Sequence, residues 1–239
     1  MSKKLKFFFG VSYLIILVIF LYFIFSQVEI SKLNDFLYYK EIQITLENYI
    51  GSDLFFNLVL FFIFSVVWIL LLGFGSPLLI ISGVLFGKWV GTLVSVISIS
   101  IGALLLYILA GFFFTDLIYK KVEKKFSKYI ELFKKNEFYY FFAYRFVGGL
   151  GIPFFLQNIL PVIFNMKKSN YFFSSFFGFI PSFFIFNTIG SGLNIYIKQA
   201  ENFNFINLIL TKEIYLPIAF FIVVVFVSTI IKKKIFYDK

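Results

Sequence analysis

Long apolar runs separated by short charged segments form the main pattern of the chain. They lie at Phe7–Ser26, Asn57–Leu72, Val90–Phe114, Tyr171–Ile197 and Ile214–Ile231. Several of them reach the ~20 residues that a helix needs to cross the hydrocarbon core of a bilayer. The pattern therefore predicts an all-α integral membrane protein, and the length of 239 residues is typical of one compact membrane domain.

The amino-acid composition agrees with a membrane protein. Hydrophobic residues make up 61% of the chain and charged residues 14%, whereas soluble domains carry about 25% charged residues. The chain contains no Cys and no His, so disulfides are excluded, and neither a transition-metal site nor a His general base is expected. We expect no cofactor and no enzymatic activity. The many Phe residues are most simply explained by a coding bias toward A+T.

The first apolar run has features of a signal peptide and of an anchor. Lys3, Lys4 and Lys6 precede it, but the run is longer than a typical signal core and ends in Phe25-Ser26-Gln27, without a small-x-small cleavage pattern. We therefore expect Met1–Ser26 to remain in the protein as the first membrane span.

Gly and Pro interrupt two of the apolar segments. Asp53–Gly87 contains Gly73-Phe74-Gly75-Ser76-Pro77, and Phe138–Asn165 contains Gly148-Gly149-Leu150-Gly151-Ile152-Pro153. A membrane helix can end and reverse at such residues when the irregular backbone is buried in protein or lines a wet cavity. Each segment is then a re-entrant hairpin. The alternative is that Pro77 and Pro153 only kink continuous helices.

The positions of the lysines favour the hairpins. If both segments return to the side from which they start, the N-terminal lysines, the basic Asp116–Glu137 segment, Lys167-Lys168 and Lys232–Lys234 lie inside, and the acidic Gln27–Asp53 segment lies outside. With one hairpin or none, at least one basic segment falls outside, against the positive-inside rule. The lysines thus predict four full transmembrane helices plus two opposed re-entrant hairpins, with both termini in the cytoplasm. The expected location is a bacterial inner or plasma membrane.

The two charged segments have helical patterns of their own. Apolar residues recur loosely at helical spacing in Gln27–Asp53, and Ile118, Val122 and Phe126 fall on one helical face of Asp116–Glu137. Both segments are interpreted as helices on the membrane surface.

The predicted order of elements is an inverted repeat, an architecture common among transporters. One hairpin precedes the span Val90–Phe114, and a second hairpin of opposite direction precedes Tyr171–Ile197. We expect an anchor with external surface helices over residues 1–53, the two repeats over residues 54–197, and a helix with a basic tail over residues 198–239.

Arg145 is the strongest candidate for a functional side chain. It is the one Arg among the 22 Lys and Arg residues, and it lies in an apolar arm. A charge within hydrocarbon is costly unless it faces a partner or a cavity, and the planar guanidinium suits phosphate. Gln157 and Asn158, on the returning arm, are further candidates. The alternatives are structural: Arg145 bonds carbonyls at Gly148–Gly151 or extends to the inner interface, and the amides satisfy loose backbone.

A Pro opens the returning arm of each hairpin. Ser76-Pro77 is typical of an N-cap followed by the first helical residue, and Ile152-Pro153 has the same order without a capping oxygen. Helix N-termini carry unpaired N–H groups and bind anions. We expect the two ends to meet near the membrane midplane and to form, with Arg145, one site for a negative group.

The charges also limit how transport could be driven. No acidic residue lies inside an apolar segment, and Asp53, Asp116, Glu137 and Glu213 all lie at segment edges. A proton relay usually needs a carboxylate within the membrane. The sequence contains no recognisable nucleotide-binding loop. The net charge of +10 comes from lysines that flank the apolar segments, which indicates contact with anionic headgroups rather than nucleic acid.

On these motifs the chain resembles the VTT-domain branch of the DedA superfamily, also called SNARE-associated Golgi proteins. The resemblance covers about residues 55–195 and rests on Gly75-Ser76-Pro77 through Ser82-Gly83-Val84-Leu85-Phe86-Gly87 with Gly91 and Gly102, on Tyr144-Arg145-Phe146 through Ile152-Pro153 and Asn158, and on Phe177-Gly178-Phe179-Ile180-Pro181 through Ile189-Gly190. The candidate hairpin breaks are Gly73, Gly75, Pro77, Gly83, Gly87, Gly148, Gly149, Gly151, Pro153, Pro181 and Gly190.

The resemblance implies a flippase or scramblase that moves phospholipid or polyprenyl-phosphate headgroups between leaflets. Arg145, Gln157, Asn158 and Ser76 are then expected to line the path, and the partners are membrane lipids, above all anionic phospholipid or a carrier-lipid phosphate. Two alternatives stay open: a secondary transporter of a small anionic solute, and a membrane-organising protein that transports nothing. A homo-oligomer is a possible assembly.

Overall fold

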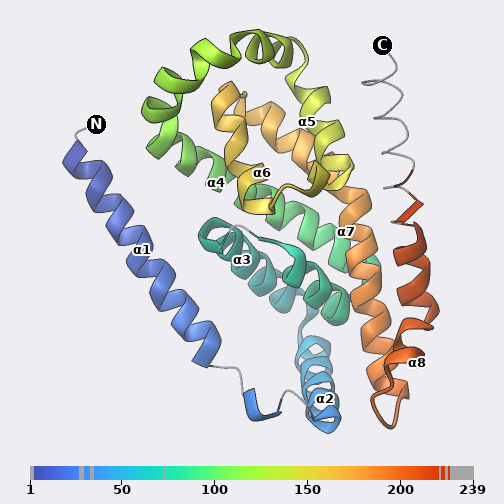
Figure 1. The fold of residues 1–239 in the computed structure, drawn as a ribbon. Coiled ribbons are helices and arrows are strands. Elements are labelled where there is room, and N and C mark those ends of the chain that lie inside the picture. The colour runs from blue at the N-terminus through green and yellow to red at the C-terminus, as the bar shows by residue number, and fades with distance from the viewer. Residues whose placement is uncertain are drawn as a thin grey trace.

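The structure is a computed structural model that describes residues 3–26, 30–32, 35–72, 74–220, 222–223 and 226. Every regular element among these residues is a helix (Figure 1). In chain order they are α1 (Lys3–Ser26), η1 (Ile30–Lys32), α2 (Phe36–Ser52), α3 (Leu54–Leu72), α4 (Ser76–Lys135), α5 (Glu137–Phe146), η2 (Gly148–Gly151), α6 (Phe154–Ile159), η3 (Leu160–Phe164), α7 (Lys168–Gln199) and α8 (Phe205–Ile209), followed by helical residues 212–220.

Four of the described helices are long and apolar enough to cross a membrane, over Phe7–Ser26, Leu54–Leu71, Ser76–Phe113 and Lys168–Gln199. They confirm an all-helical, multi-pass integral membrane protein. The predicted spans Val90–Phe114 and Tyr171–Ile197 lie inside α4 and α7. The segment assigned to the first arm of a hairpin, α3, has the length and composition of a full span as well.

The last predicted span, Ile214–Ile231, is helical over residues 214–220, and most of its remainder lies outside the described residues. Both charged segments contain the expected helices. Asp35 caps α2 by accepting a 2.9 Å hydrogen bond from the backbone N–H of Leu37, and α4 stays helical through Lys135. The side chains of 114–129, with the predicted apolar face of Asp116–Glu137, lie outside the described part.

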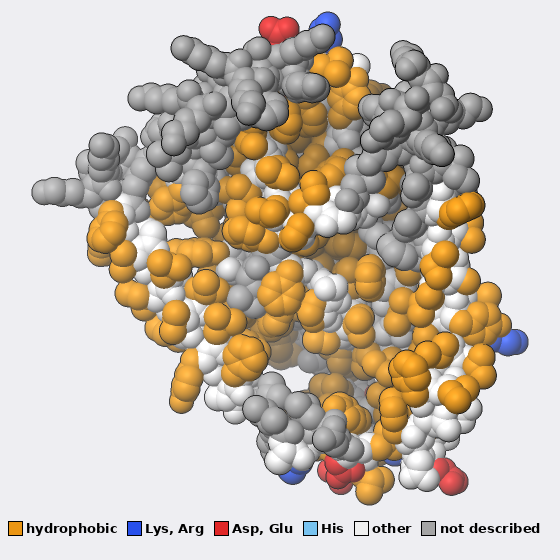
Figure 2. All heavy atoms as spheres, viewed as in Figure 1, with side chains coloured by type: hydrophobic (Ala, Val, Ile, Leu, Met, Phe, Trp, Pro, Cys, Tyr) orange, Lys and Arg blue, Asp and Glu red, His pale blue; other side chains and the backbone are white. Residues whose placement is uncertain are grey.

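Hydrophobic side chains cover the face shown in Figure 2, and the coloured charged side chains gather mainly at its two ends. An apolar surface of this kind suits contact with lipid tails, because a bilayer core offers no partner for a polar group. The core lies between α4 and α7, which pack along each other, with α3 against α4 and α5 against α7. Ile69, Leu78 and Ile99 are fully buried there.

Glycines bring α4 and α7 into backbone contact. A Cβ at Gly83 would lie 2.2 Å from the carbonyl oxygen of Asn187, and one at Gly190 would lie 2.2 Å from that of Ile80. Close approach through small residues is common between membrane helices. The grouping of Gly83, Pro181 and Gly190 with the hairpin breaks is therefore wrong: all three lie inside α4 or α7.

The chain reverses at Gly87, one of the candidate breaks. This residue has φ 73° and ψ 178° within α4, a conformation open to Gly because it lacks a Cβ. Ser82 Oγ donates a 3.0 Å hydrogen bond to the carbonyl of Gly91, although nine residues of straight helix would separate them by about 14 Å. Residues 76–86 are therefore a separate arm, folded against the rest of α4.

A second, shorter hairpin runs from α5 through η2 to α6 and η3. Its tip needs glycine, because Gly148, Gly149 and Gly151 have φ of 74°, 74° and 80°. Its two ends meet: the Glu137 carboxylate accepts hydrogen bonds from the Lys167 backbone N–H (3.2 Å) and from Asn170 Nδ2 (2.6 Å). With 10 residues, α5 is only about 15 Å long, half the thickness of a hydrocarbon core.

The helix starts after the two breaks differ by one residue from the prediction. Gly75 is the N-cap of α4, so Ser76 is the first helical residue and its side chain caps nothing. Pro153, with φ −54° and ψ 136°, is the N-cap of α6. The fixed φ of proline, about −65°, fits both the N-cap and the first turn, and therefore does not distinguish them. Gly73 lies outside the described residues.

Candidate functional site

Arg145 is buried in the middle of the helix bundle. It lies in the last turn of α5, and only 1% of its surface is exposed. Gly178 of α7 makes room for it, because a Cβ at Gly178 would lie 2.5 Å from Arg145 Cβ. The packing of α5 on α7 thus directs the arginine away from lipid, so the alternative in which it extends to the inner interface is wrong.

The guanidinium joins three elements through hydrogen bonds. Arg145 Nη1 donates to Gln157 Oε1 (3.0 Å), and Nη2 donates to Asn158 Oδ1 (2.6 Å) and to the Tyr171 hydroxyl (3.0 Å). Arg145 is therefore bonded to side chains of α6 and α7, and not to the carbonyls of Gly148–Gly151. The structure brings together the three predicted residues Arg145, Gln157 and Asn158.

Aromatic rings surround the same cation. The guanidinium carbon lies 4.7 Å from the ring centroids of Phe141 and Phe179, 5.5 Å from that of Phe154 and 5.7 Å from that of Tyr171. Ring faces attract cations, by about 0.5–2 kcal/mol each. Among the described residues Arg145 forms no ion pair, so its charge is held by neutral oxygens and by rings.

Two donors of this cluster have no partner. Arg145 Nε and Asn158 Nδ2 are buried, and neither forms a hydrogen bond within the described part of the protein. A buried donor without an acceptor costs about 1–3 kcal/mol. A positive charge without a counter-charge, beside two unused donors, is an environment that favours an anion.

A cavity of about 310 Å³ opens next to the cluster. Arg145, Gln157 and Gly148 line it from the second hairpin, and Gly75 and Ser76 line it from the first turn of α4. Residues of the two breaks therefore border one cavity, and Ser76 lies at its wall although it is not a cap. Gly75 and Ser76 are the N-cap and the first residue of α4, and the first N–H groups of a helix have no partner within it.

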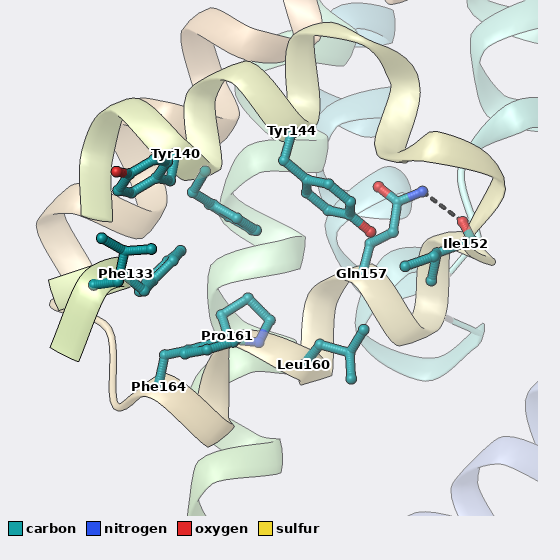
Figure 3. Close-up of a pocket in the computed structure, with 10 residues that line it drawn as sticks. Phe133, Tyr140, Tyr144, Ile152, Gln157, Leu160, Pro161 and Phe164 are labelled. Atoms are coloured by element: carbon teal, nitrogen blue, oxygen red, sulfur yellow. Dashed lines mark hydrogen bonds between the residues drawn. The ribbon is translucent and has the colours of Figure 1, made fainter. Parts of the chain in front are cut away.

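A second cavity, of about 360 Å³, also has Gln157 in its wall (Figure 3). Its walls are almost entirely apolar, from the end of α4, α5 and η3: Leu132, Phe133, Tyr140, Phe141, Tyr144, Ile152, Leu160, Pro161 and Phe164. Gln157 borders both cavities, and its Nε2 donates a 2.7 Å hydrogen bond to the Ile152 carbonyl. The Gln157 side chain is thus part of the wall of both cavities, and of the two only the first is also lined by a charged residue, Arg145.

Tyr171 is the main residue of the site that the sequence did not predict. Its ring stacks on Tyr107 at 4.5 Å, and the Tyr107 hydroxyl donates a 2.6 Å hydrogen bond to the Met166 carbonyl. These contacts hold the Tyr171 hydroxyl against Arg145. A tyrosine at the start of an apolar run resembles an interfacial anchor, so its pattern alone does not reveal this contact.

The described residues contain no group of three or more His, Cys, Asp or Glu side chains that could hold a metal ion. What the structure does place at the site is a cation and hydrogen-bond donors beside a small cavity.

Comparison with known proteins identifies the family. The model of the VTT domain matches residues 70–192, which is more than half of the chain. The match includes both breaks, Arg145, its amide partners, Tyr171 and the glycines between α4 and α7. No curated protein and no solved structure matches the chain. The chain therefore belongs to the VTT-domain family of membrane proteins, in agreement with the DedA-type motifs in its sequence.

Proposed function

We propose that the protein is a lipid transporter, a scramblase or flippase that lets the phosphate of a phospholipid or polyprenyl-phosphate pass between leaflets beside Arg145. Arg145 carries the proposal: it is 1% exposed, lacks a carboxylate partner among the described residues, and lines a cavity. Its own Nε and the Nδ2 of Asn158 are unused donors, although Asn158 is fully buried and, contrary to expectation, does not line that cavity. A bound phosphate would supply the missing negative charge and the missing acceptors.

The size of the site favours a headgroup over a whole lipid. The Arg145 cavity of about 310 Å³ is bordered by side chains of a helix bundle whose outer surface is largely apolar. The lipid tails would remain in the bilayer, and only the charged group would need protein partners. The transported atoms would thus be the part of the lipid that cannot cross hydrocarbon unaided.

The two hairpins are proposed to enter the membrane from opposite sides as an inverted repeat. Three observations support this arrangement: the short α5, the contact of Glu137 with Lys167 and Asn170, and the reversal at Gly87. The lysine distribution agrees, because it places the basic segments on one side. Both termini would be cytoplasmic, in a bacterial inner or plasma membrane.

Leaflet exchange in liposomes tests the function. Purified protein is reconstituted with a fluorescent phospholipid, and an impermeant quencher reports the fraction that reaches the outer leaflet. We expect exchange without any ion gradient. The exchange rate should fall at least about tenfold in Arg145→Gln, since removing one charged hydrogen-bond partner costs about 1.5–3 kcal/mol. It should not change in Lys168→Gln, which removes the same charge at an exposed position.

Each other outcome rejects a part of the proposal. Unchanged exchange in a folded Arg145→Gln protein would remove Arg145 from the path. Uptake of labelled inorganic phosphate without lipid exchange would identify a solute transporter. Absence of both activities in folded wild-type protein would leave the membrane-organising role.

Single cysteines test the topology, because the native chain contains none. One cysteine is placed at Gly51, Lys88, Lys124 or Lys168, and intact cells are treated with an impermeant thiol reagent. We expect labelling from outside at 51 and 88, and only after permeabilisation at 124 and 168. Labelling of 124 and 168 from opposite faces would show that the second hairpin crosses the membrane, and labelling of 51 and 88 from opposite faces would show the same for the first.

A further inference from the structure

A larger cavity lies away from Arg145, between the start of the long segment of α4, the middle of α7 and helical residues 212–220. Its volume is about 890 Å³, and it shares no lining residue with the Arg145 cavity. Gly192 permits the third wall to approach, because a Cβ there would lie 2.7 Å from Glu213 Cβ. Pro181 and Pro217 lie in two of the walls, and a proline inside a helix bends it. We call this cavity the α4–α7 groove.

Most of the α4–α7 groove is apolar. Val96, Ile97, Ile180, Leu216 and Phe220 are among its lining residues. The hydroxyls of its two threonines are bonded within their own helices, Thr92 to the Lys88 carbonyl and Thr188 to the Phe184 carbonyl. They therefore need no polar partner in the groove, which is suited to a hydrocarbon chain along this part.

One part of the groove is charged. Lys88, Lys212 and Glu213 line it, and neither lysine forms an ion pair in the part of the chain that the structure describes. With two amines and one carboxylate, this part of the groove carries a net positive charge. Trp89, beside Lys88, is 70% exposed and packs on Phe184 at 4.9 Å. Lysine and tryptophan together are typical of the level of lipid headgroups.

From this combination we propose that the α4–α7 groove binds one membrane lipid with an anionic headgroup. The phosphate lies at Lys88 and Lys212, and an acyl chain follows α4 toward Ile97, about 14 Å along the helix. The charge selects a negative lipid, and the apolar walls select a chain over a free anion. This site is independent of the proposed transport at Arg145.

The two tryptophans of the chain make a direct test possible, because Trp68 lies on α3 and Trp89 in the groove. The Trp68→Phe protein is reconstituted in phosphatidylcholine that contains increasing fractions of bromine-labelled phosphatidylglycerol or bromine-labelled phosphatidylcholine. Bromine quenches a tryptophan that it touches. We expect Trp89 to prefer phosphatidylglycerol, with a relative affinity on the order of fivefold greater for each lysine.

A matched pair of variants assigns the preference. Lys88→Gln with Lys212→Gln should abolish it, whereas Lys167→Gln with Lys168→Gln, which removes the same charge elsewhere, should preserve it. Equal quenching by both lipids, a preference that survives the first pair, or one that is lost in the second pair would each overturn the proposal. If Trp68→Phe does not fold, the difference between wild type and Trp89→Phe gives the same quantity.

Discussion

Asn158 Oδ1 accepts a 2.6 Å hydrogen bond from Arg145 Nη2, while Nδ2 of the same amide has no partner. One side chain thus holds the cation through its oxygen and presents a donor through its nitrogen. An amide can do both, whereas a carboxylate of the same shape can only accept. This difference allows a structural role of Arg145 to be separated from a role in binding.

Asn158→Asp should abolish lipid exchange without unfolding the protein. The new carboxylate would lie against Arg145, pair with its charge and remove the free donor, so that a phosphate would lose both reasons to bind. We expect exchange to fall at least about tenfold, with a Tm equal to or above that of the wild type. Exchange and Tm are measured on the same preparation; a folded variant with normal exchange would show that the Arg145 cluster is structural.

Gly190→Ala should destabilise the protein by about 1–3 kcal/mol, the usual cost of overpacking. Its new Cβ would lie 2.2 Å from the backbone oxygen of Ile80, in the arm 76–86. This oxygen can move away only if the helical arm moves with it. Gly51→Ala is the control, because no atom lies within 4 Å of that Cβ and alanine favours the helix. The Tm in detergent should fall in the first variant only, and equal Tm values would contradict the tight α4–α7 contact.

Glu137→Ala should loosen the second hairpin. Glu137 is 7% exposed, and its carboxylate accepts hydrogen bonds from the Lys167 N–H and from Asn170. The loss of a buried acceptor costs about 1–3 kcal/mol. Glu137→Gln keeps one acceptor and should lose less. Glu131→Ala, an exposed residue with the same charge, should leave the Tm unchanged. Sensitivity to protease cleavage near residues 148–152 should be lowest in the wild type, higher in Glu137→Gln and highest in Glu137→Ala.

Acid should weaken the docking of α2 on α7. The hydrogen bond from Lys198 holds the pKa of Glu47 below its ordinary value of 4.5. The folded state therefore binds the proton less readily than the unfolded state, so this contribution is present above about pH 4.5 and is lost as the pH falls through the lowered pKa. Both side chains are 45% exposed, so the effect is small and salt reduces it.

Comparison of two proteins measures this effect. The Tm of the wild type should fall more steeply below pH 4.5 than the Tm of Lys198→Gln, and the difference should shrink at high salt. Parallel Tm curves at low salt would show that the pair contributes nothing to folding.

The helices and the candidate site differ in how far a sequence predicts them. Apolar runs mark helices, and Gly87 and the Gly148–Gly151 tip reverse the chain where glycine is needed for a positive φ. Gln157 and Asn158 could be predicted beside Arg145 because all three lie in one hairpin. Tyr171 belongs to another helix, 26 residues from Arg145 along the chain, and its contact depends on how α5 packs on α7.

The glycines of the family motif show the same limit. Gly83 and Gly87 are four residues apart and look alike in the sequence, yet one lies against the backbone of α7 and the other has nothing within 4 Å of its Cβ position. Only the tertiary packing separates a glycine needed for close approach from one needed for a turn. The N-cap of α4 was likewise placed one residue late, because proline fits two neighbouring positions.

Three parts of the protein around the Arg145 cavity contact α7. Gly178 lies against Arg145, Gly190 against Ile80 of the arm 76–86, and Asn170 against Glu137 at the base of the second hairpin. Transporters that work by rocking need two bodies that can separate around their cargo. In this protein a single helix, α7, contacts both hairpins. We therefore expect headgroups to pass Arg145 at a site that stays fixed. Exchange should follow the concentration gradient of the lipid and be equally fast in both directions.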